Sequence, residues 1–423
     1  MSAIVTQTHS RLTRLSALAL SASAIAATLG ATSAPARADD LMDAFTGGTP
    51  TLELRPRWEF VDKDGKAGAA AFTMRTLLGF STKPVDDFGA TLQFINVANI
   101  DGAYNDLVNG KVRYAPIPDP SDTNVNQAYV TFTGLPDTTI TAGRQIINQD
   151  DVRFVGNVDF RQNMQTFDAL TVTSKPVPDV KVTASYAWGI KDILNRHIPA
   201  RIFLGEAGWA PIKQAQGEVF SYWYGNEADN LVAGAAACGL VGPQACNSVT
   251  YGLRAHGNVP LPASFSVDYK ATYAHQSAYD GGSAKIDADY AQASAKLTWT
   301  DYFVNAEYML MGSNGNGTYG FQTPLATKHA FNGWDEIFLT TPPAGLRTIS
   351  AGGGATLYGA TLSAKYYDFR SDYKDKSYGS EWDLSLTYAL NSHVMGGVEY
   401  ADYRAEGFGA NTQSGWAFVK VTY

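Results

Sequence analysis

The chain of 423 residues carries 40 acidic and 32 basic side chains, which gives a formal charge of −8. This acidity excludes a general role in nucleic-acid binding, because such proteins need a basic surface. The chain also has 23 tyrosines, 40 glycines and 12% aromatic residues. That composition is typical of strands with one apolar face and one wet face.

Residues 1–38 have the pattern of a secretory signal peptide. Two arginines precede an apolar stretch at 15–29, and a small-x-small cleavage site ends at Ala38. The apolar run is too short to serve as a membrane anchor, which is the alternative. We therefore expect a mature chain that begins at Asp39 and, having lost three arginines and no acidic residue, carries a formal charge of −11. Residues 39–50 are then expected to form a short periplasmic segment.

The first segment of the mature chain with a strict period of two is 51–60. Its apolar face carries Leu52, Leu54, Trp58 and Phe60, and its charged face carries Glu53, Arg55, Arg57 and Glu59. In a soluble sandwich the apolar face would be the core. In a membrane barrel that face meets lipid, and the charged face lines the lumen.

The same alternation recurs along the chain and predicts eighteen strands, with sixteen as the alternative if the two weakest segments, 201–211 and 346–357, are not strands. The predicted strands are 51–60, 70–83, 88–98, 124–134, 138–148, 166–175, 179–190, 201–211, 216–226, 248–258, 263–277, 287–300, 302–313, 346–357, 359–370, 379–390, 394–404 and 414–423. Most have about the ~9–11 residues that a tilted strand needs to cross a membrane.

Short connections alternate with long ones at 99–123, 149–165, 227–247 and 314–345. This rhythm is typical of outer-membrane barrels, which have tight periplasmic turns and long outer loops. We therefore expect an all-β fold, a transmembrane antiparallel up-and-down β-barrel over 51–423, with outer loops that fold inward. The last strand ends on Tyr423, and we expect it to close the barrel and to be recognised by the barrel-assembly machinery.

Several segments resemble the alginate-export family of outer-membrane channels. The likeness is dense over roughly 51–190, and the matching segments are 57–65 (RWEFVDKDG), 125–130 (VNQAYV), 143–148 (GRQIIN), 153–157 (RFVGN) and 161–169 (RQNMQTFDA). The resemblance implies an eighteen-stranded monomeric channel, which agrees with the strand count read from the alternation.

The loop at 149–165 is too polar for lipid, and with its flanks it carries three arginines. If the loop folds inward, Arg144, Arg153 and Arg161 would form a cationic constriction, because rings of arginine make anion-selective pores. Alternatively, these arginines pair with nearby acids, such as Asp168, and pin the loop. The residues expected to line the pore or set its selectivity are Glu53, Arg55, Arg57, Glu59, Arg75, Arg144, Arg153, Arg161 and Asp168.

The charges at inward positions are nearly balanced, which suits a polar, anionic or sugar-like solute, or salt bridges that only hold the barrel's shape. We expect a passive channel in the bacterial outer membrane, surrounded by its lipids, that passes such solutes or exports a polysaccharide. No enzyme activity, cofactor or metal is expected. The alternative is a lipid-facing phospholipase-type hydrolase that uses His275 and Ser277, which share one strand face.

The two cysteines, Cys238 and Cys246, lie in the predicted loop 227–247. In the oxidising envelope, two cysteines so close in one outer loop are expected to form a disulfide.

Overall fold

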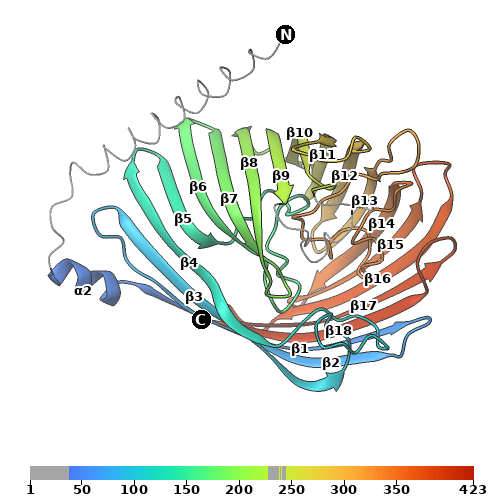
Figure 1. The fold of residues 1–423 in the computed structure, drawn as a ribbon, viewed down its shortest axis with the longest axis horizontal. Coiled ribbons are helices and arrows are strands. Elements are labelled where there is room, and N and C mark those ends of the chain that lie inside the picture. Colours follow the sequence, from blue (N-terminus) through green and yellow to red (C-terminus); the bar gives the residue numbers. More distant parts are fainter. Residues whose placement is uncertain (1–37, 227–237, 239, 241–243) are drawn as a thin grey trace, which may run out of the picture.

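The computed structural model describes residues 38–226, 238, 240 and 244–423. Apart from its last residue, the segment interpreted as a signal peptide lies outside these residues. The described chain forms one closed sheet of 18 antiparallel strands, in which each strand pairs with its neighbours in the sequence and β1 pairs with β18 (Figure 1). The predicted all-β barrel of eighteen strands is confirmed, and the two weakest segments are the strands β8 and β14.

The strands are β1 (Thr49–Lys63), β2 (Ala69–Ser81), β3 (Phe88–Ala103), β4 (Asp122–Leu135), β5 (Thr138–Gln145), β6 (Thr166–Val177), β7 (Val180–Lys191), β8 (His197–Ile212), β9 (Ala215–Asn226), β10 (Ser248–Pro260), β11 (Phe265–Ala278), β12 (Asp287–Trp299), β13 (Tyr302–Met311), β14 (Leu346–Leu357), β15 (Ala360–Arg370), β16 (Ser377–Ala389), β17 (Val394–Ala405) and β18 (Thr412–Thr422).

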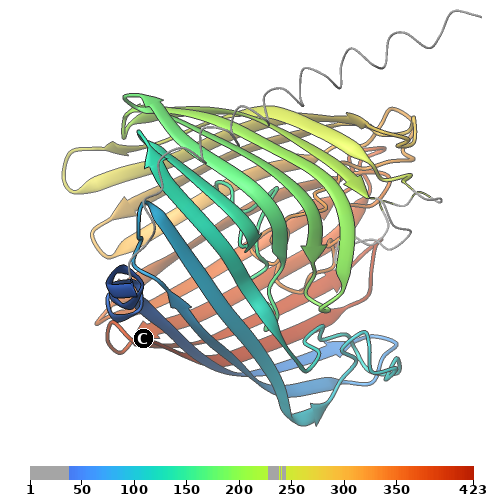
Figure 2. The same cartoon turned by 60° about the vertical axis from the view of Figure 1, so that its left-hand side comes forward.

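The two ends of the barrel differ in their connections. At one end, which we call the short-turn end, the strands are joined by turns such as 136–137, 178–179 and 358–359. The opposite, long-loop end carries the connections 104–121, 146–165 and 312–345. Segments of these loops lie in the space that the strands enclose (Figure 2), so the long loops do fold inward.

The wall is apolar outside and polar inside, the reverse of a soluble domain. Along β1, Trp58 and Phe60 are 51% and 46% exposed, whereas Glu59 between them is 4% exposed. On β2, Arg75, which pairs with Arg55 in the strand register, is 0% exposed. Only a closed sheet can satisfy its backbone groups in lipid, and the closure of β1 on β18 meets that requirement. No helix in the described part of the chain combines the length and the hydropathy needed to cross a membrane.

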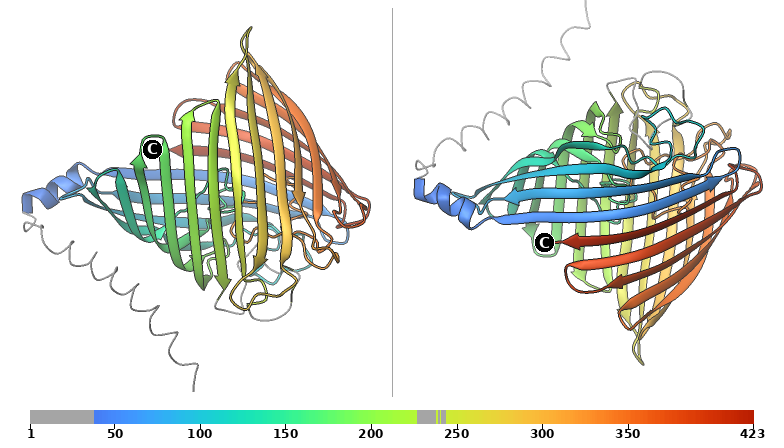
Figure 3. Two further views of the ribbon diagram at one scale, coloured as in Figure 1. Left: turned by 90° about the horizontal axis from the view of Figure 1, so that it is seen from above. Right: turned by 90° about the horizontal axis from the view of Figure 1, so that it is seen from below.

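A short helix precedes the barrel, in the segment 39–50 for which the sequence analysis gave no secondary structure. This helix, α2 (Ala38–Thr46), has Asp39 and Asp40 in its first turn. Acidic side chains at that position stabilise a helix, because they lie at the positive end of the helix dipole. It projects from the wall at the short-turn end, next to the start of β1 (Figure 3).

A hydrophobic core lies inside the barrel near the long-loop end. Inward side chains of β12, β15 and β17 are fully buried there, among them Tyr290, Phe369 and Tyr403. They pack against Phe154 of loop 146–165 and Phe338 of loop 312–345. The lumen near the long-loop end is therefore packed like a protein interior, and the polar space lies toward the short-turn end.

Candidate pore and its inward loops

Three arginines of β1 and β2 hold loop 146–165 against the barrel wall. The Arg55 guanidinium donates to the carbonyl oxygens of Asp159 at 2.8 Å and of Arg161 at 2.6 Å. Arg75 donates to the Glu53 carboxylate at 2.7 Å, and its ion pair with Asp159 also measures 2.7 Å. An arginine fork suits this task, because it supplies several fixed donors at once. The wall thus fixes the loop backbone as well as its charges.

Arg161 joins this wall to a second loop. Its guanidinium lies 3.0 Å from the Glu59 carboxylate of β1 and also bonds the carboxylate of Glu336, from loop 312–345. Asp119, from loop 104–121, lies 3.8 Å from the same guanidinium and pairs with Arg57. Three connections that are far apart in the sequence therefore meet at one buried charged cluster, which we call the loop clamp: Arg57, Glu59, Asp119, Arg161 and Glu336.

The loop clamp is covered by aromatic rings. The guanidinium groups of Arg57 and Arg161 each lie 5.0 Å from the centre of the Phe160 ring. That ring also stacks on His329 of loop 312–345. Burial lowers the pKa of His329 to about 4, although the bond to Glu336 acts in the opposite direction. Burial raises the pKa of Glu336, but Arg161 and His329 outweigh it and bring that pKa down to about 2. The clamp thus joins a charged carboxylate to a neutral imidazole near neutral pH.

Arg153 lies in a different environment from Arg161. It is 2% exposed, and its guanidinium contacts the sulfur atoms of Met309, at 3.2 Å, and Met311, at 2.7 Å. The rings of Phe331 and Tyr290 lie 4.8 Å and 5.8 Å from the same group. Contacts with rings and thioethers stabilise a desolvated cation. Arg153 thus attaches loop 146–165 to the inner wall and to loop 312–345.

Arg144 has yet another partner. It forms a two-pronged pair with Asp168 across β5 and β6, at 2.8 Å and 3.0 Å. Arg144, Arg153 and Arg161 therefore have three separate sets of partners. Only Arg144 pairs with the acid named in the pinning alternative, Asp168. Arg161 pairs instead with Glu59, Asp119 and Glu336, and the Arg153 guanidinium contacts thioethers and rings.

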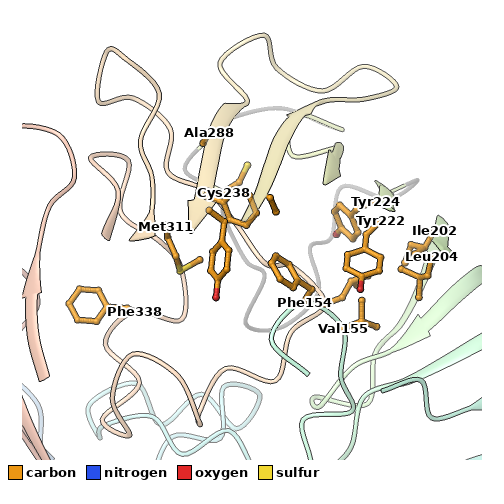
Figure 4. Close-up of a cluster of buried hydrophobic side chains, with 14 of the residues drawn as sticks. Phe154, Val155, Ile202, Leu204, Tyr222, Tyr224, Cys238, Ala288, Met311 and Phe338 are labelled. Atoms are coloured by element: carbon orange, nitrogen blue, oxygen red, sulfur yellow. The ribbon is translucent and has the colours of Figure 1, made fainter. Parts of the chain in front are cut away.

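The tip of loop 146–165 supplies the centre of the apolar core. Figure 4 shows Phe154 between the labelled side chains Tyr222 and Met311. Its ring lies 5.2 Å from that of Phe220 and 5.1 Å from that of Tyr290. A loop that carries charged residues thus also places a large apolar side chain across the lumen, and together these contacts fix its position.

Beneath the loop, on the short-turn side, lies a cavity of 690 Å³. Its charged lining consists of Lys213, Lys270, Lys296, Lys365 and His256 together with Asp150, Asp151, Asp268 and Glu307.

Two of the cavity's lysines are engaged by acids. Lys270 pairs with Asp150 and Asp151 at the tip of the loop, and Lys365 lies 3.2 Å from Glu307. Lys213 and Lys296 make no ion pair with an acidic side chain among the described residues, and both line the cavity. The Lys296 ammonium lies 4.6 Å from the centre of the Phe303 ring.

A second cavity, of 340 Å³, lies on the other side of the same segment of the loop. Its lining includes Asp150, which it shares with the first cavity, and the hydroxyl groups of Thr171, Thr173 and Thr183. Asp150 also bonds Arg254 of β10 at 2.9 Å. The loop tip therefore lies between two polar cavities, and the lining of the second also includes Lys181, Glu206 and Glu218.

The remaining sequence candidates lie away from this space. Cys238 and Cys246 are joined by a disulfide with a Cα–Cα distance of 5.8 Å, and Cys238 packs into the apolar core. His275 bonds Asp289 of β12 at 2.9 Å. Within the described chain, Ser277 makes no hydrogen bond to His275, so the pair lacks the contact between nucleophile and base that hydrolysis needs. The described residues also contain no group of three His, Cys, Asp or Glu placed to hold a metal ion.

Sequence reasoning missed two members of the loop clamp, Asp119 and Glu336, and the neighbouring His329. All three belong to irregular loops, where no periodicity indicates which side chains meet the wall. For the cavity the alternation is informative, because it puts Lys270 and Lys296 among the inward charges of their strands.

The fold matches several solved structures at low sequence identity. OccK9 (OpdG) of Pseudomonas aeruginosa is 12% identical with a TM-score of 0.69, and the match covers 90% of this chain and 100% of that one. OpdL of the same organism is 16% identical with a TM-score of 0.65, over 89% and 99% of the two chains. A structure of OpdK with vanillate, also from P. aeruginosa, is 13% identical with a TM-score of 0.67, over 88% and 98%.

At these identities the similarity shows the fold alone, a closed barrel of 18 antiparallel strands. A scan against models of protein families finds no match. A search of curated proteins finds none either. The resemblance to the alginate-export family therefore stays an interpretation of the sequence.

Proposed function

We propose that this chain is an outer-membrane channel through which small polar solutes that carry a carboxylate diffuse passively. The observation that carries the proposal is the 690 Å³ cavity inside a closed barrel, in which Lys213 and Lys296 form no ion pair with an acid of the described part of the chain. Neighbouring acids keep the other lysines neutralised, so a carboxylate would be held by few and weak contacts. A solute must bind well enough to enter a pore and weakly enough to leave it.

One of the similar structures supports this proposal by the ligand named with it. That structure contains vanillate, a small aromatic carboxylate. The apolar core packed by loops 146–165 and 312–345 favours small solutes over a polymer, because a polymer would require these loops to leave the lumen. Residues 1–38, with the pattern of a secretory signal, and the apolar outer wall support placement in the bacterial outer membrane.

A flux measurement with a matched pair of solutes tests the proposal. Gluconate and sorbitol are linear six-carbon polyols of similar size, and only gluconate has a carboxylate. Proteoliposomes that contain the purified chain are expected to take up labelled gluconate faster than labelled sorbitol, and Lys296→Gln should narrow that difference. Lys111→Gln, in the exposed part of loop 104–121, is the control and should leave it unchanged.

Equal entry of the two solutes would mean a general pore without carboxylate preference, which contradicts the proposed selectivity. If neither solute enters faster than into empty liposomes, the channel itself is excluded.

A further inference from the structure

The helix α2 presents an apolar stripe that the barrel leaves uncovered. Leu41, Met42 and Phe45 are 53%, 65% and 62% exposed. Their spacing puts all three on one side of the helix, because residues four apart lie one above the other. Asp43 falls on the opposite side. In water, the exposure of three large apolar side chains on nine helical residues is unfavourable, and such a patch indicates an interaction surface.

The helix is held firmly against the rim of the barrel. The backbone N–H of Lys83, in the turn after β2, donates to the Ala44 carbonyl at 3.0 Å. Gly48 allows the chain to pass directly over β2, since a Cβ there would lie 2.2 Å from the Phe80 ring. The direction of the apolar stripe is therefore fixed relative to the barrel wall.

That direction coincides with the outer surface of the barrel. The Phe45 ring stacks on the ring of Phe80, with 6.2 Å between centres and 18° between planes. Phe80 lies in an outward row of the wall, beside Leu92 of β3, which is 46% exposed. The stripe on α2 thus continues the apolar band of the wall.

The same level of the wall carries a belt of exposed aromatic side chains. Around the short-turn end these are Phe88, Trp209, Trp299, Tyr302 and Tyr388, each between 44% and 59% exposed. Aromatic belts of this kind lie at the boundary between headgroups and acyl chains. Through the contact between Phe45 and Phe80, α2 extends this belt beyond the strands.

We propose that α2 lies in the membrane surface at the short-turn end, with Leu41, Met42 and Phe45 inserted among the lipid acyl chains. This inference rests on the proposed membrane location and goes beyond it, because the barrel needs no such helix to span a bilayer. Burial of apolar area drives the insertion. The charged side chains at positions 39, 40 and 43 are all acidic, so they do not attract anionic headgroups.

Site-specific fluorescence in vesicles tests the anchor. The chain is purified from the outer-membrane fraction of an expressing bacterium, with Met42→Cys or Asp43→Cys, and is labelled with an environment-sensitive NBD dye. The native cysteines are joined in a disulfide, so the new thiol takes the label. After reconstitution in phosphatidylcholine–phosphatidylglycerol vesicles, the label at position 42 should emit at shorter wavelength and be quenched several-fold more by brominated lipids than the label at 43.

A second substitution makes the test specific to the apolar stripe. Phe45→Ser should return the label at position 42 to aqueous emission, whereas Phe45→Leu should not. If both labels behave as in water while the barrel remains folded and protease-resistant in the vesicles, the anchor is wrong and the channel proposal stands. If both labels are shielded from water but not quenched by brominated lipid, protein and not lipid covers the helix, and the anchor is again wrong. Failure of the barrel to insert would count against the proposed function itself.

Discussion

Arg161 and Glu336 form an ion pair inside the barrel that joins two loops separated by 175 positions in the sequence. The side chains of these residues are only 5% and 15% exposed. Because Arg161 also bonds Glu59 of β1, a single guanidinium connects both inward loops to the wall.

Removal of Arg161 should therefore loosen both loops together. Arg161→Ala leaves Glu336 buried without its arginine, whereas Glu59 and Asp119 keep Arg57. Loss of one partner of a buried pair costs about 3–5 kcal/mol. We expect amides of loops 146–165 and 312–345 to exchange with deuterium much faster, with the strands unchanged. Arg404→Ala, which removes an exposed pair with Asp402, should change little. Exchange confined to loop 146–165 would contradict a shared clamp.

Arg153 should matter for packing and not for ion selectivity. Its guanidinium is surrounded by thioethers and rings, and well-packed apolar groups can replace such a buried charge at little cost. We expect Arg153→Met to preserve both loop protection and the reversal potential in a salt gradient. Arg153→Ala should destabilise the loop contact by about 2–5 kcal/mol, as large-to-small changes in cores do. A shift of the reversal potential toward cations in Arg153→Met would show instead that this arginine acts on permeating ions.

Loop 312–345 should become less stable as the pH rises through the range from about 4 to 7. Burial, with added repulsion from Asp383 and Asp402, raises the pKa of Asp335 from 3.8 to about 7, against the bonds from Ser414 and the Tyr403 N–H. Between about pH 4 and 7 the Asp335 carboxyl binds more protons in the folded loop than in the open loop. The protection of the loop amides against exchange therefore falls as the pH increases through this range, and it is constant at higher pH.

Hydrogen exchange of the loop, corrected for the intrinsic pH dependence, measures this effect. The difference between the natural chain and Asp335→Asn isolates the contribution of that carboxyl, because Glu336 acts in the opposite sense at lower pH, between about 2 and 4.5. Identical pH profiles for the two proteins would refute the assignment.

Gly333 should not tolerate a side chain. Its φ is +85°, and a Cβ there would lie 2.3 Å from the Glu381 carboxylate oxygen. The left-handed conformation alone costs a residue with a side chain about 1–2 kcal/mol, and the contact adds to it. We expect Gly333→Ala to increase proteolysis of loop 312–345 in the reconstituted protein. Gly315→Ala, in the same loop but with open space around it, is the matched control, and equal sensitivity of the two variants would contradict the argument.

The strands could be predicted from the sequence because each side chain on a strand reports its own face. Alternation at 51–60 was sufficient to put Glu53 and Arg57 inside and Trp58 outside, and the same rule located all eighteen strands. The helix α2 went unpredicted because nine residues with three large apolar side chains give a weak helical signal, although the pattern at Leu41, Met42 and Phe45 is visible in retrospect.

The interior could be predicted only in part, because loops have no period. The sequence indicated that loop 149–165 folds inward and carries important arginines. It could not indicate that Arg161 meets Glu336 while Arg153 meets Met309 and Met311. Those partners depend on how three irregular segments pack within a space whose width is set by the whole barrel.

The packed interior near the long-loop end has a consequence for assembly. Tyr290 and Phe369 project from the inner wall, and until the loops dock they face water on the inside while the opposite face of their strands meets lipid. The loops pack on inward side chains of several strands, such as Tyr290 and Phe369. We therefore expect assembly in two stages, in which the wall closes first and the loops then dock and exclude water from the inner surface.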